Sequence, residues 1–268
     1  MSIKIITDSA ADLPREIIDK YNIRVIPIYV FLNGKEFLDG ETLKADTLYK
    51  DMRNGKIYKT AQITPETFKK VFIEYAKNDE ECIYIAFSSG LSGTYQASII
   101  AKEEVLEEYP NFKLDIIDTK CASLGFGLVV YRAALMLEQG KSRKEIVEAI
   151  KFYSEHTEHI FTVDNLEYLY RGGRVSKTSA FIGGVLNIKP ILDVEDGRLV
   201  PIEKVRGRKK ALKQLVEMAQ ERGINLKHQI IGISHGDCLE EALIVKDMMI
   251  KKFDCKEFII NNITRCAS

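Results

Sequence analysis

The sequence has no excess of charge of either sign. Lysine and arginine total 39, aspartate and glutamate also total 39, and the formal net charge is zero. A neutral chain has no overall basic field that would draw it to nucleic acid or to an anionic membrane. The sequence also shows no helix-turn-helix signature. We therefore expect no nucleic-acid partner and at most a transient contact with membranes.

Cysteine is scarce, and long apolar runs are absent. The five cysteines are odd in number and include no CxxC pair, and three lie in apolar surroundings typical of buried thiols. They are Cys82, Cys121, Cys238, Cys255 and Cys266. A reducing compartment suits this pattern. Met1 leads into the apolar run Ile3 to Thr7 without a signal sequence, and no uncharged run is long enough to span a bilayer. We expect a cytoplasmic protein.

Metal and nucleotide motifs are missing as well. The four histidines are scattered, and His156 and His159 have no cysteine or carboxylate at a metal-ligand spacing. The glycine-rich segment Ser88 to Thr94 is not a Walker A loop, because no lysine follows the glycine, and it lacks GxGxxG. The sequence therefore predicts neither a metal site nor a cofactor.

What the sequence does contain is an alternation of short apolar runs with helical patterns. Four runs of the first half are typical of strands. They are Ile3 to Thr7, Ile23 to Leu32, Cys82 to Phe87 and Leu114 to Asp118. The alternation predicts a parallel, Rossmann-like sheet with helical crossovers in an N-terminal α/β domain, residues 1–157. The remainder, residues 158–268, predicts a second α/β domain with a mixed sheet, so the fold class is two-domain α/β.

Local signals mark the ends of several elements. Thr64-Pro65 and a Ser142/Glu145 capping box indicate helix starts, and Asp12 and the Asp237/Glu240 pair are interpreted as further caps. Two dipeptides, Asn33-Gly34 and Asp196-Gly197, predict tight hairpins.

Three strands of the first domain end in small hydroxyl residues that a helix follows. The loops are Thr7-Asp8-Ser9, Ser88 to Thr94, and Asp118 to Ser123. In an open α/β sheet such loops gather at the carboxyl edge, where ligands bind. In the middle loop, glycines let the backbone approach a ligand, and N–H groups at the helix start favour an anion. We therefore expect an anionic group near Ser92.

Two other interpretations of this edge stay open. Gly90 and Gly93 could simply make the turn while Ser92 or Thr94 caps the helix. Alternatively, a hydrolase or phosphotransferase could use Ser92 with Asp8 or Asp118. No base is assigned to this serine; histidine is the usual activator, and His235 is the only one that follows a strand and precedes a helix.

Cations concentrate in the second half of the chain. In Arg171-Gly172-Gly173-Arg174 a glycine pair stops a helix and fans out two guanidinium groups. Such groups bind phosphate or dock an acidic partner, whereas the plainer alternative is a solvated loop. The candidates for a partner surface are Arg174, Lys177 and Arg206.

Taken in order, the motifs resemble the bacterial DegV family along nearly the whole chain. They are Thr7-Asp8-Ser9, Thr60-Ala61-Gln62, Ser88 through Tyr95, Asp118 with Ser123-Leu124-Gly125, Leu169 through Ser176, and Leu186 through Pro190. The resemblance implies a two-domain α/β protein that binds a long-chain fatty acid and is not itself a catalyst. Several family members serve a fatty acid kinase, whose catalytic subunit phosphorylates the carboxylate. The acyl phosphate then enters phospholipid synthesis.

The same resemblance assigns roles to residues. Thr60 and Ser92 become donors to the ligand carboxylate, and Arg171 with Arg174 shapes the pocket mouth or the partner surface. The expected ligand-binding set is Thr60, Gln62, Ser92, Gly93, Thr94, Ser123 and Arg171. The candidate tail-lining residues, each of which could equally be ordinary core, are Phe126, Phe181, Ile182, Leu186 and Ile188.

Two departures from the family pattern stand out. The family uses a histidine in a His-Thr-Gly-Pro-Gly stretch near the C-terminus, and this sequence stops at Ser268 before such a stretch. Either the C-terminal domain is shortened in this sequence or the third carboxylate contact is missing. Ala61 stands where the family more often has serine.

Overall fold

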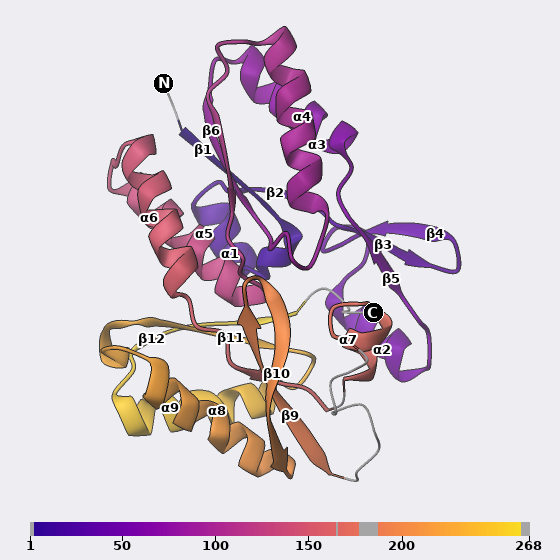
Figure 1. The fold of residues 1–268 in the computed structure, drawn as a ribbon, viewed down its shortest axis with the longest axis vertical. Helices are drawn as coiled ribbons and strands as arrows, with labels where there is room; N and C mark the ends of the chain where they lie inside the picture. Colours follow the sequence, from indigo (N-terminus) through magenta and orange to yellow (C-terminus); the bar gives the residue numbers. More distant parts are fainter. Residues whose placement is uncertain (1–2, 165, 177–186, 264–268) are drawn as a thin grey trace.

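The computed structural model describes residues 3–164, 166–176 and 187–263 (Figure 1). Its first half is built on a four-stranded parallel sheet in the order β2-β1-β6-β7. The strands are β1 (Ile3–Asp8), β2 (Arg24–Ile26), β6 (Glu81–Ala86) and β7 (Leu114–Asp118). Central strand β6 is apolar after Glu81, and the last four residues of β1 are buried as well, because helices cover both faces of these strands.

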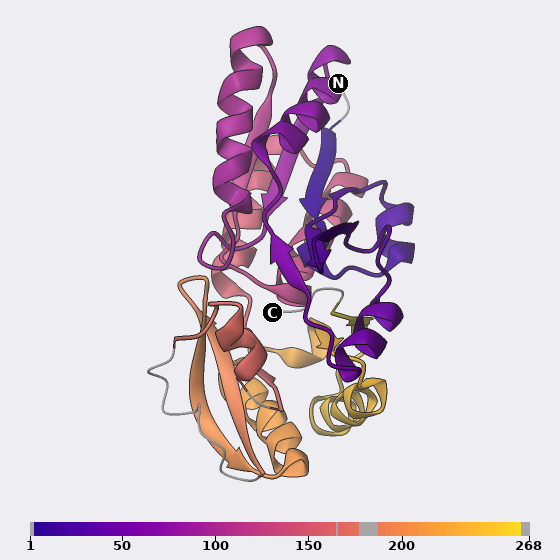
Figure 2. The ribbon, with the colours of Figure 1, turned by 90° about the vertical axis from the view of Figure 1, so that its right-hand side faces the viewer.

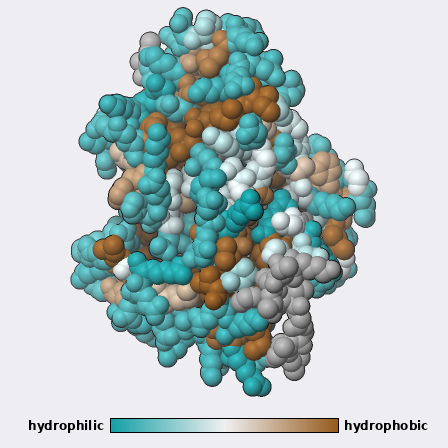
Figure 3. Space-filling model, viewed as in Figure 1, coloured by the Kyte–Doolittle hydropathy of each residue, from teal (hydrophilic) through white to brown (hydrophobic). Residues whose placement is uncertain are grey.

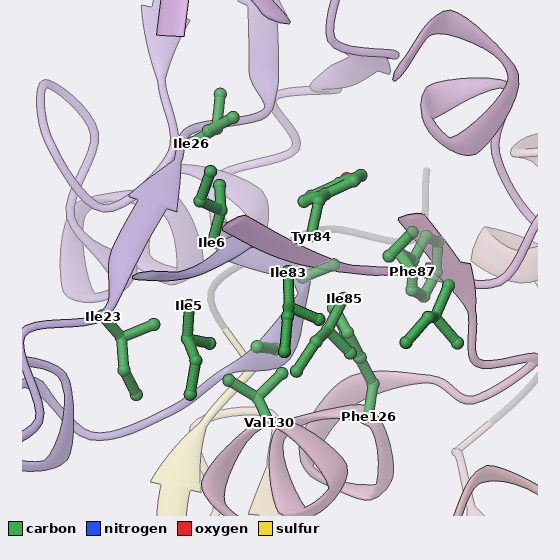
Figure 4. Packing of buried hydrophobic residues seen from close by; sticks show 14 of the residues in the cluster. Ile5, Ile6, Ile23, Ile26, Ile83, Tyr84, Ile85, Phe87, Phe126 and Val130 are labelled. Atoms are coloured by element: carbon green, nitrogen blue, oxygen red, sulfur yellow. The ribbon is translucent and has the colours of Figure 1, made fainter. Parts of the chain in front are cut away.

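Alternate residues of β6 pack against helices on opposite faces of the sheet. The ring of Tyr84 lies 5.0 Å from that of Phe68 on one face, whereas Ile83 points toward Val130 on the other (Figure 4). The first face is covered by α3 (Pro65–Lys77) and α4 (Thr94–Glu108). The second face is covered by α5 (Ser123–Glu138) and α6 (Arg143–His156). Short helices η1 (Ser9–Ala11) and α1 (Arg15–Lys20) follow β1.

The run Ile23 to Leu32, expected as one strand, forms two strands in different sheets. After β2, the chain enters a small antiparallel sheet in the order β4-β3-β5, in which α2 connects β4 to β5. Its elements are β3 (Tyr29–Leu32), β4 (Lys35–Leu38), α2 (Ala45–Arg53) and β5 (Lys59–Ala61). Pro27 lies at the break, because proline has no N–H to continue a ladder.

The second half contains an antiparallel sheet, β10-β9-β8, and a separate parallel pair, β11-β12. Its elements are β8 (Phe161–Thr162), α7 (Glu167–Arg171), β9 (Ile188–Glu195), β10 (Arg198–Arg206), α8 (Arg208–Arg222), η2 (Leu226–His228), β11 (Ile230–His235), α9 (Leu239–Phe253) and β12 (Glu257–Asn262). The predicted α/β class with a parallel N-terminal sheet is confirmed. The division between residues 157 and 158 stays a prediction.

Several local signals are confirmed. Thr64 caps α3 by accepting a hydrogen bond from the Thr67 amide, and Ser142 and Glu145 form both bonds of the predicted capping box. The hairpin at Asp196-Gly197 joins β9 to β10, with φ of 45° and 75° at its two turn residues.

Two predicted helix caps are wrong. Asp12 adopts a left-handed conformation with φ of 48°, and its carboxylate accepts a hydrogen bond from Ser123 rather than capping α1. Asp237 is also left-handed, with φ of 56°. The N-cap of α9 is the next residue, Cys238, and its side chain makes no capping bond. The sequence pattern gave no sign of either backbone conformation.

The two halves of the molecule meet along α5. Leu128 on this helix packs against Gly232 of β11, and Ile230 and Ile259 of the second half join the main hydrophobic core. Helix α5 therefore lies between the parallel sheet and the β11-β12 pair. Among the residues described, no helix has the length and apolar character needed to cross a membrane.

Candidate functional site

The hydroxyl-bearing loops gather at the carboxyl edge of the parallel sheet, as predicted. The Asp8 carboxylate at the end of β1 accepts a hydrogen bond of 3.2 Å from the Phe87 amide after β6. The Asp118 carboxylate at the end of β7 accepts bonds from the amide and the hydroxyl of Ser89, at 3.1 and 2.5 Å. Both carboxylates thus connect their own loop to the central loop.

The central loop ends at the start of α4, where the first amide of the helix donates to Ser92, so the capping role considered for Ser92 is present. The Ser92 hydroxyl lies 2.9 Å from the Thr94 hydroxyl and 3.3 Å from the Thr94 amide. Helix α4 begins after Gly93, a residue without a side chain that could cap the helix, and carries no acidic residue in its first turn. The first N–H groups of a helix have no partner within the helix and carry the positive end of its dipole. This end of α4 is therefore suited to a negatively charged group beside the partly exposed Ser92.

A second segment, at the end of β5, lies against this helix start. The Gln62 side chain packs on Gly93 so closely that a Cβ there would lie 2.9 Å from Gln62 Cδ and closer still to its Oε1. The Ile63 amide donates a 3.3 Å hydrogen bond to the Thr94 hydroxyl. Thr60 lies on β5, paired with Val30. The structure thus brings the expected residue Gln62 against Gly93, and its neighbour Ile63 against Thr94, although about 30 positions separate the two segments in the sequence.

The two carboxylates considered for catalysis are committed to other contacts. Asp8 is fully buried and accepts bonds from the Ala10 amide, the Tyr84 hydroxyl and the Phe87 amide. Asp118 binds Ser89 and pairs with Lys120 at 3.1 Å. The Ser92 hydroxyl is hydrogen-bonded to Thr94, and in the described residues no histidine bonds to it. This geometry does not form a nucleophile with its base. Nor is any cluster of three His, Cys, Asp or Glu arranged to hold a metal within the described part of the chain.

Ser123 lies in a polar network between the two halves of the molecule. Its hydroxyl lies 2.7 Å from Asp12 Oδ2 and 3.0 Å from the Ser234 hydroxyl on β11. Asn261 on β12 donates to the Asp12 carbonyl at 2.8 Å. These contacts join residues up to 249 positions apart, so no local sequence pattern could indicate them.

His159 is a structural residue that the sequence did not indicate. Its Nε2 accepts a hydrogen bond of 3.1 Å from the amide of Ala122, which precedes α5, and its Nδ1 lies 3.1 Å from the Thr157 carbonyl. The ring also packs against Gly125. Burial lowers the pKa of His159 below its ordinary value, which favours the neutral ring that this acceptor role requires.

The cationic candidates lie in different surroundings. Arg171 is exposed, pairs with Glu167 on its own helix and lies over the Tyr168 ring. Arg174 donates from Nε to the Leu91 carbonyl at 3.3 Å, so it contacts the residue before Ser92. Arg206 is exposed near the end of β10, and Lys177 lies outside the described residues.

The tail-lining candidates are only partly described. Phe126 is fully buried, with its ring 6.2 Å from that of Phe87, and Ile188 is partly buried at the start of β9. Phe181, Ile182 and Leu186 lie outside the described residues. On the face shown in Figure 3, hydrophobic side chains gather in patches in the upper part and near the middle of the molecule, within a mostly hydrophilic surface.

Comparisons with known proteins agree on one family. A family model described as an uncharacterised protein of the DegV family matches residues 2–267. A DegV domain-containing protein of Clostridium perfringens is 41% identical over 262 residues, covering 97% of this chain and 90% of that protein.

Solved structures are also similar to this chain along nearly its whole length. A Thermotoga maritima protein, reported to reveal a fatty acid binding function, has 31% identity and a TM-score of 0.84, covering 98% of this chain and 92% of its own. The fatty acid kinase (Fak) B3 protein of Streptococcus pneumoniae, loaded with linoleic acid, has 25% identity and a TM-score of 0.85, covering 98% and 93% of the two chains.

Proposed function

The chain belongs to the DegV family, and from this premise we propose that it binds one long-chain fatty acid in the cytoplasm and presents the carboxylate to the catalytic subunit of a fatty acid kinase. The acyl phosphate formed there would enter phospholipid synthesis. The observation that carries the proposal is the contact between the Gln62 segment and the start of α4 at Gly93. Relatives of the same fold that bind fatty acids support it.

The head group requires donors that replace water. An ionised carboxylate removed from water costs several kcal/mol unless it is hydrogen-bonded. In this proposal the hydroxyls of Thr60 and Ser92, the Gln62 amide and the amides at the start of α4 supply those bonds. Thr94 holds the two segments together through its bonds to Ile63 and Ser92. None of these groups needs to act as a nucleophile. Ser123 and Arg171 stay further candidates for the site.

The tail supplies most of the gross affinity. Burial of ~15 methylenes at about 0.8 kcal/mol each corresponds to a driving force on the order of 12 kcal/mol. Phe126 and Ile188, with Phe181, Ile182 and Leu186, are the proposed lining. Arg206 and Lys177 are proposed contacts for the kinase subunit.

Mass spectrometry of an organic extract of the purified protein tests the carrier function. We expect a long-chain fatty acid in nearly one-to-one amount. Protein that is purified empty and also fails to take up radiolabelled oleate would contradict the proposal.

Two head-group variants test the site. Ser92→Ala and Thr60→Ala each remove one hydroxyl and should weaken fatty acid affinity roughly 10- to 150-fold, because a hydrogen bond to a charged group contributes about 1.5–3 kcal/mol. Ser142→Ala is the matched control, because it removes a helix-capping hydroxyl with a stability cost of about 1 kcal/mol and should leave affinity unchanged. Unchanged affinity in the Ser92→Ala/Thr60→Ala double variant would remove both residues from the site.

A further inference from the structure

We propose that the tip of the β9-β10 hairpin, Asp196 and Gly197, is a positioning element for the head-group site, with Ser92 in the role that the proposed function gives it. The hairpin belongs to the second half of the molecule and reaches across to the carboxyl edge of the parallel sheet (Figures 1 and 2). The carboxylate is then fully held only when the second half is docked on the first.

A short chain of hydrogen bonds leads from the hairpin tip to Ser92. The fully buried hydroxyl of Ser88 donates a 2.7 Å bond to the Gly197 carbonyl and accepts a 3.1 Å bond from the Gly90 amide. The carbonyl of the same serine accepts a 3.2 Å bond from the Ser92 amide. One residue, Ser88, therefore links the second half of the molecule to the backbone of the proposed carboxylate donor.

The junction leaves no room for a side chain on either partner. A Cβ at Gly90 would lie 2.6 Å from the Gly197 carbonyl oxygen, and a Cβ at Gly197 would press on the Ser88 hydroxyl and lie 2.8 Å from Lys120 Cδ. Contacts this short force a shift of backbone or of a buried group. The backbone of Gly197 thus packs directly on the backbone of Gly90, so a small displacement of the hairpin also displaces the loop.

A second contact holds the same loop at its other end. Arg174 Nε donates to the Leu91 carbonyl at 3.3 Å. The second half therefore grips the loop at Ser88 and at Leu91, and Ser92 is the next residue. Coupling between two binding events is reciprocal. If docking of the hairpin raises the affinity for the fatty acid, bound fatty acid must stabilise the docked hairpin to the same extent.

The chain supplies its own control for this junction. The other hairpin, at Asn33-Gly34, has the same kind of turn, with φ of 51° and 80°, but a Cβ at Gly34 would meet nothing within 4 Å. Gly34→Ala and Gly197→Ala therefore carry similar backbone strain, and only Gly197→Ala also wedges the junction. Gly90→Ala wedges it from the opposite side, and no positive φ adds strain at Gly90.

The experiment compares these three variants with the wild type. Affinity is measured with the fluorescent fatty acid cis-parinaric acid, and the head-group environment with the carboxyl resonance of bound [1-13C]oleate. We expect Gly90→Ala and Gly197→Ala to weaken affinity by about tenfold, the order of one lost buried hydrogen bond, and to shift the carboxyl resonance. Gly34→Ala should change neither. The Gly90→Ala/Gly197→Ala double variant should lose little more than either single one, since both disrupt one junction.

Two results would overturn the positioning role. One is a folded Gly90→Ala protein, checked by circular dichroism, that keeps wild-type affinity and carboxyl resonance. The other is a loss in Gly34→Ala equal to that in Gly197→Ala. If Gly197→Ala does not fold, Ser88→Ala replaces it, because it removes the bond without strain or added volume. A wild-type protein that binds neither probe would instead refute the proposed function.

Discussion

Adding a methyl group at Gly93 should displace Gln62 and weaken fatty acid binding without unfolding the protein. Gly93 has φ of −73°, so alanine fits its backbone. Its added Cβ would collide with the end of the Gln62 side chain, which is flexible and lies on an exposed residue. The collision is relieved when Gln62 swings away. The variant Gly93→Ala therefore displaces the Gln62 side chain from the proposed site at little cost to the fold.

The expected magnitudes differ between stability and binding. Replacing glycine by alanine at a compatible position stabilises a protein by about 0.4–1 kcal/mol through the unfolded state, so the urea midpoint should hold or rise. A lost hydrogen bond to a charged group costs about 1.5–3 kcal/mol, which corresponds to a loss in affinity of roughly 10- to 150-fold. Isothermal displacement of cis-parinaric acid by oleate measures the affinity, and urea unfolding measures the stability.

A double-variant cycle decides whether Gln62 is the cause. Gln62→Ala should weaken binding as much as Gly93→Ala, and the double variant should be no weaker than either, because the methyl group then displaces nothing. Wild-type affinity in Gly93→Ala would refute the contribution of Gln62. Losses that simply add in the double variant would show that the methyl group blocks the ligand directly.

Two further predictions concern residues outside the proposed ligand contacts. Asp8→Asn should lower the free energy of unfolding by about 1–3 kcal/mol or more, because the buried donors of Tyr84 and Phe87 lose their carboxylate acceptor. The folded variant should still bind fatty acid. Loss of binding in a folded, equally stable variant would restore a functional role for Asp8. Burial lowers the pKa of His159, so wild-type stability should be unaffected by this group above pH 6.5 and should fall below it, as the unfolded chain takes up a proton that the folded ring resists. Urea midpoints at pH 7.5 and 5.5 should therefore differ less in His159→Gln than in the exposed control His156→Gln, and equal differences would contradict the buried neutral ring.

The sequence was informative where the signal is local. Apolar runs located the four strands of the parallel sheet, and the hydroxyl and glycine residues of Ser88 to Thr94 located the central loop, because each depends on neighbouring residues alone. The exception at Pro27 has a local cause that the sequence also contained, since proline cannot continue a ladder and the run divides there.

Contacts between distant segments were beyond sequence reasoning. The Asp196-Gly197 and Asn33-Gly34 turns carry the same signal, yet only the first docks into another part of the chain. Ser88 and Gly197 are 109 positions apart, and their contact depends on the path of every element between them. The left-handed backbone of Asp12, which turned a predicted cap into an acceptor for Ser123, is likewise fixed by tertiary packing.

The imbalance between tail and head group determines which assay is informative. A buried hydrocarbon contributes on the order of 12 kcal/mol in gross terms, whereas each head-group bond contributes about 1.5–3 kcal/mol. Variants at Ser92, Gly93 or Gly197 should therefore still be purified with lipid bound, because the loss of one head-group bond is small beside the free energy gained by burying the hydrocarbon tail. Lipid content after purification tests the tail, and the carboxyl resonance together with competitive affinity tests the head. A positioning defect predicts full lipid content with a shifted carboxyl resonance. A tail-lining defect predicts reduced lipid content with an unchanged carboxyl resonance in the lipid that stays bound.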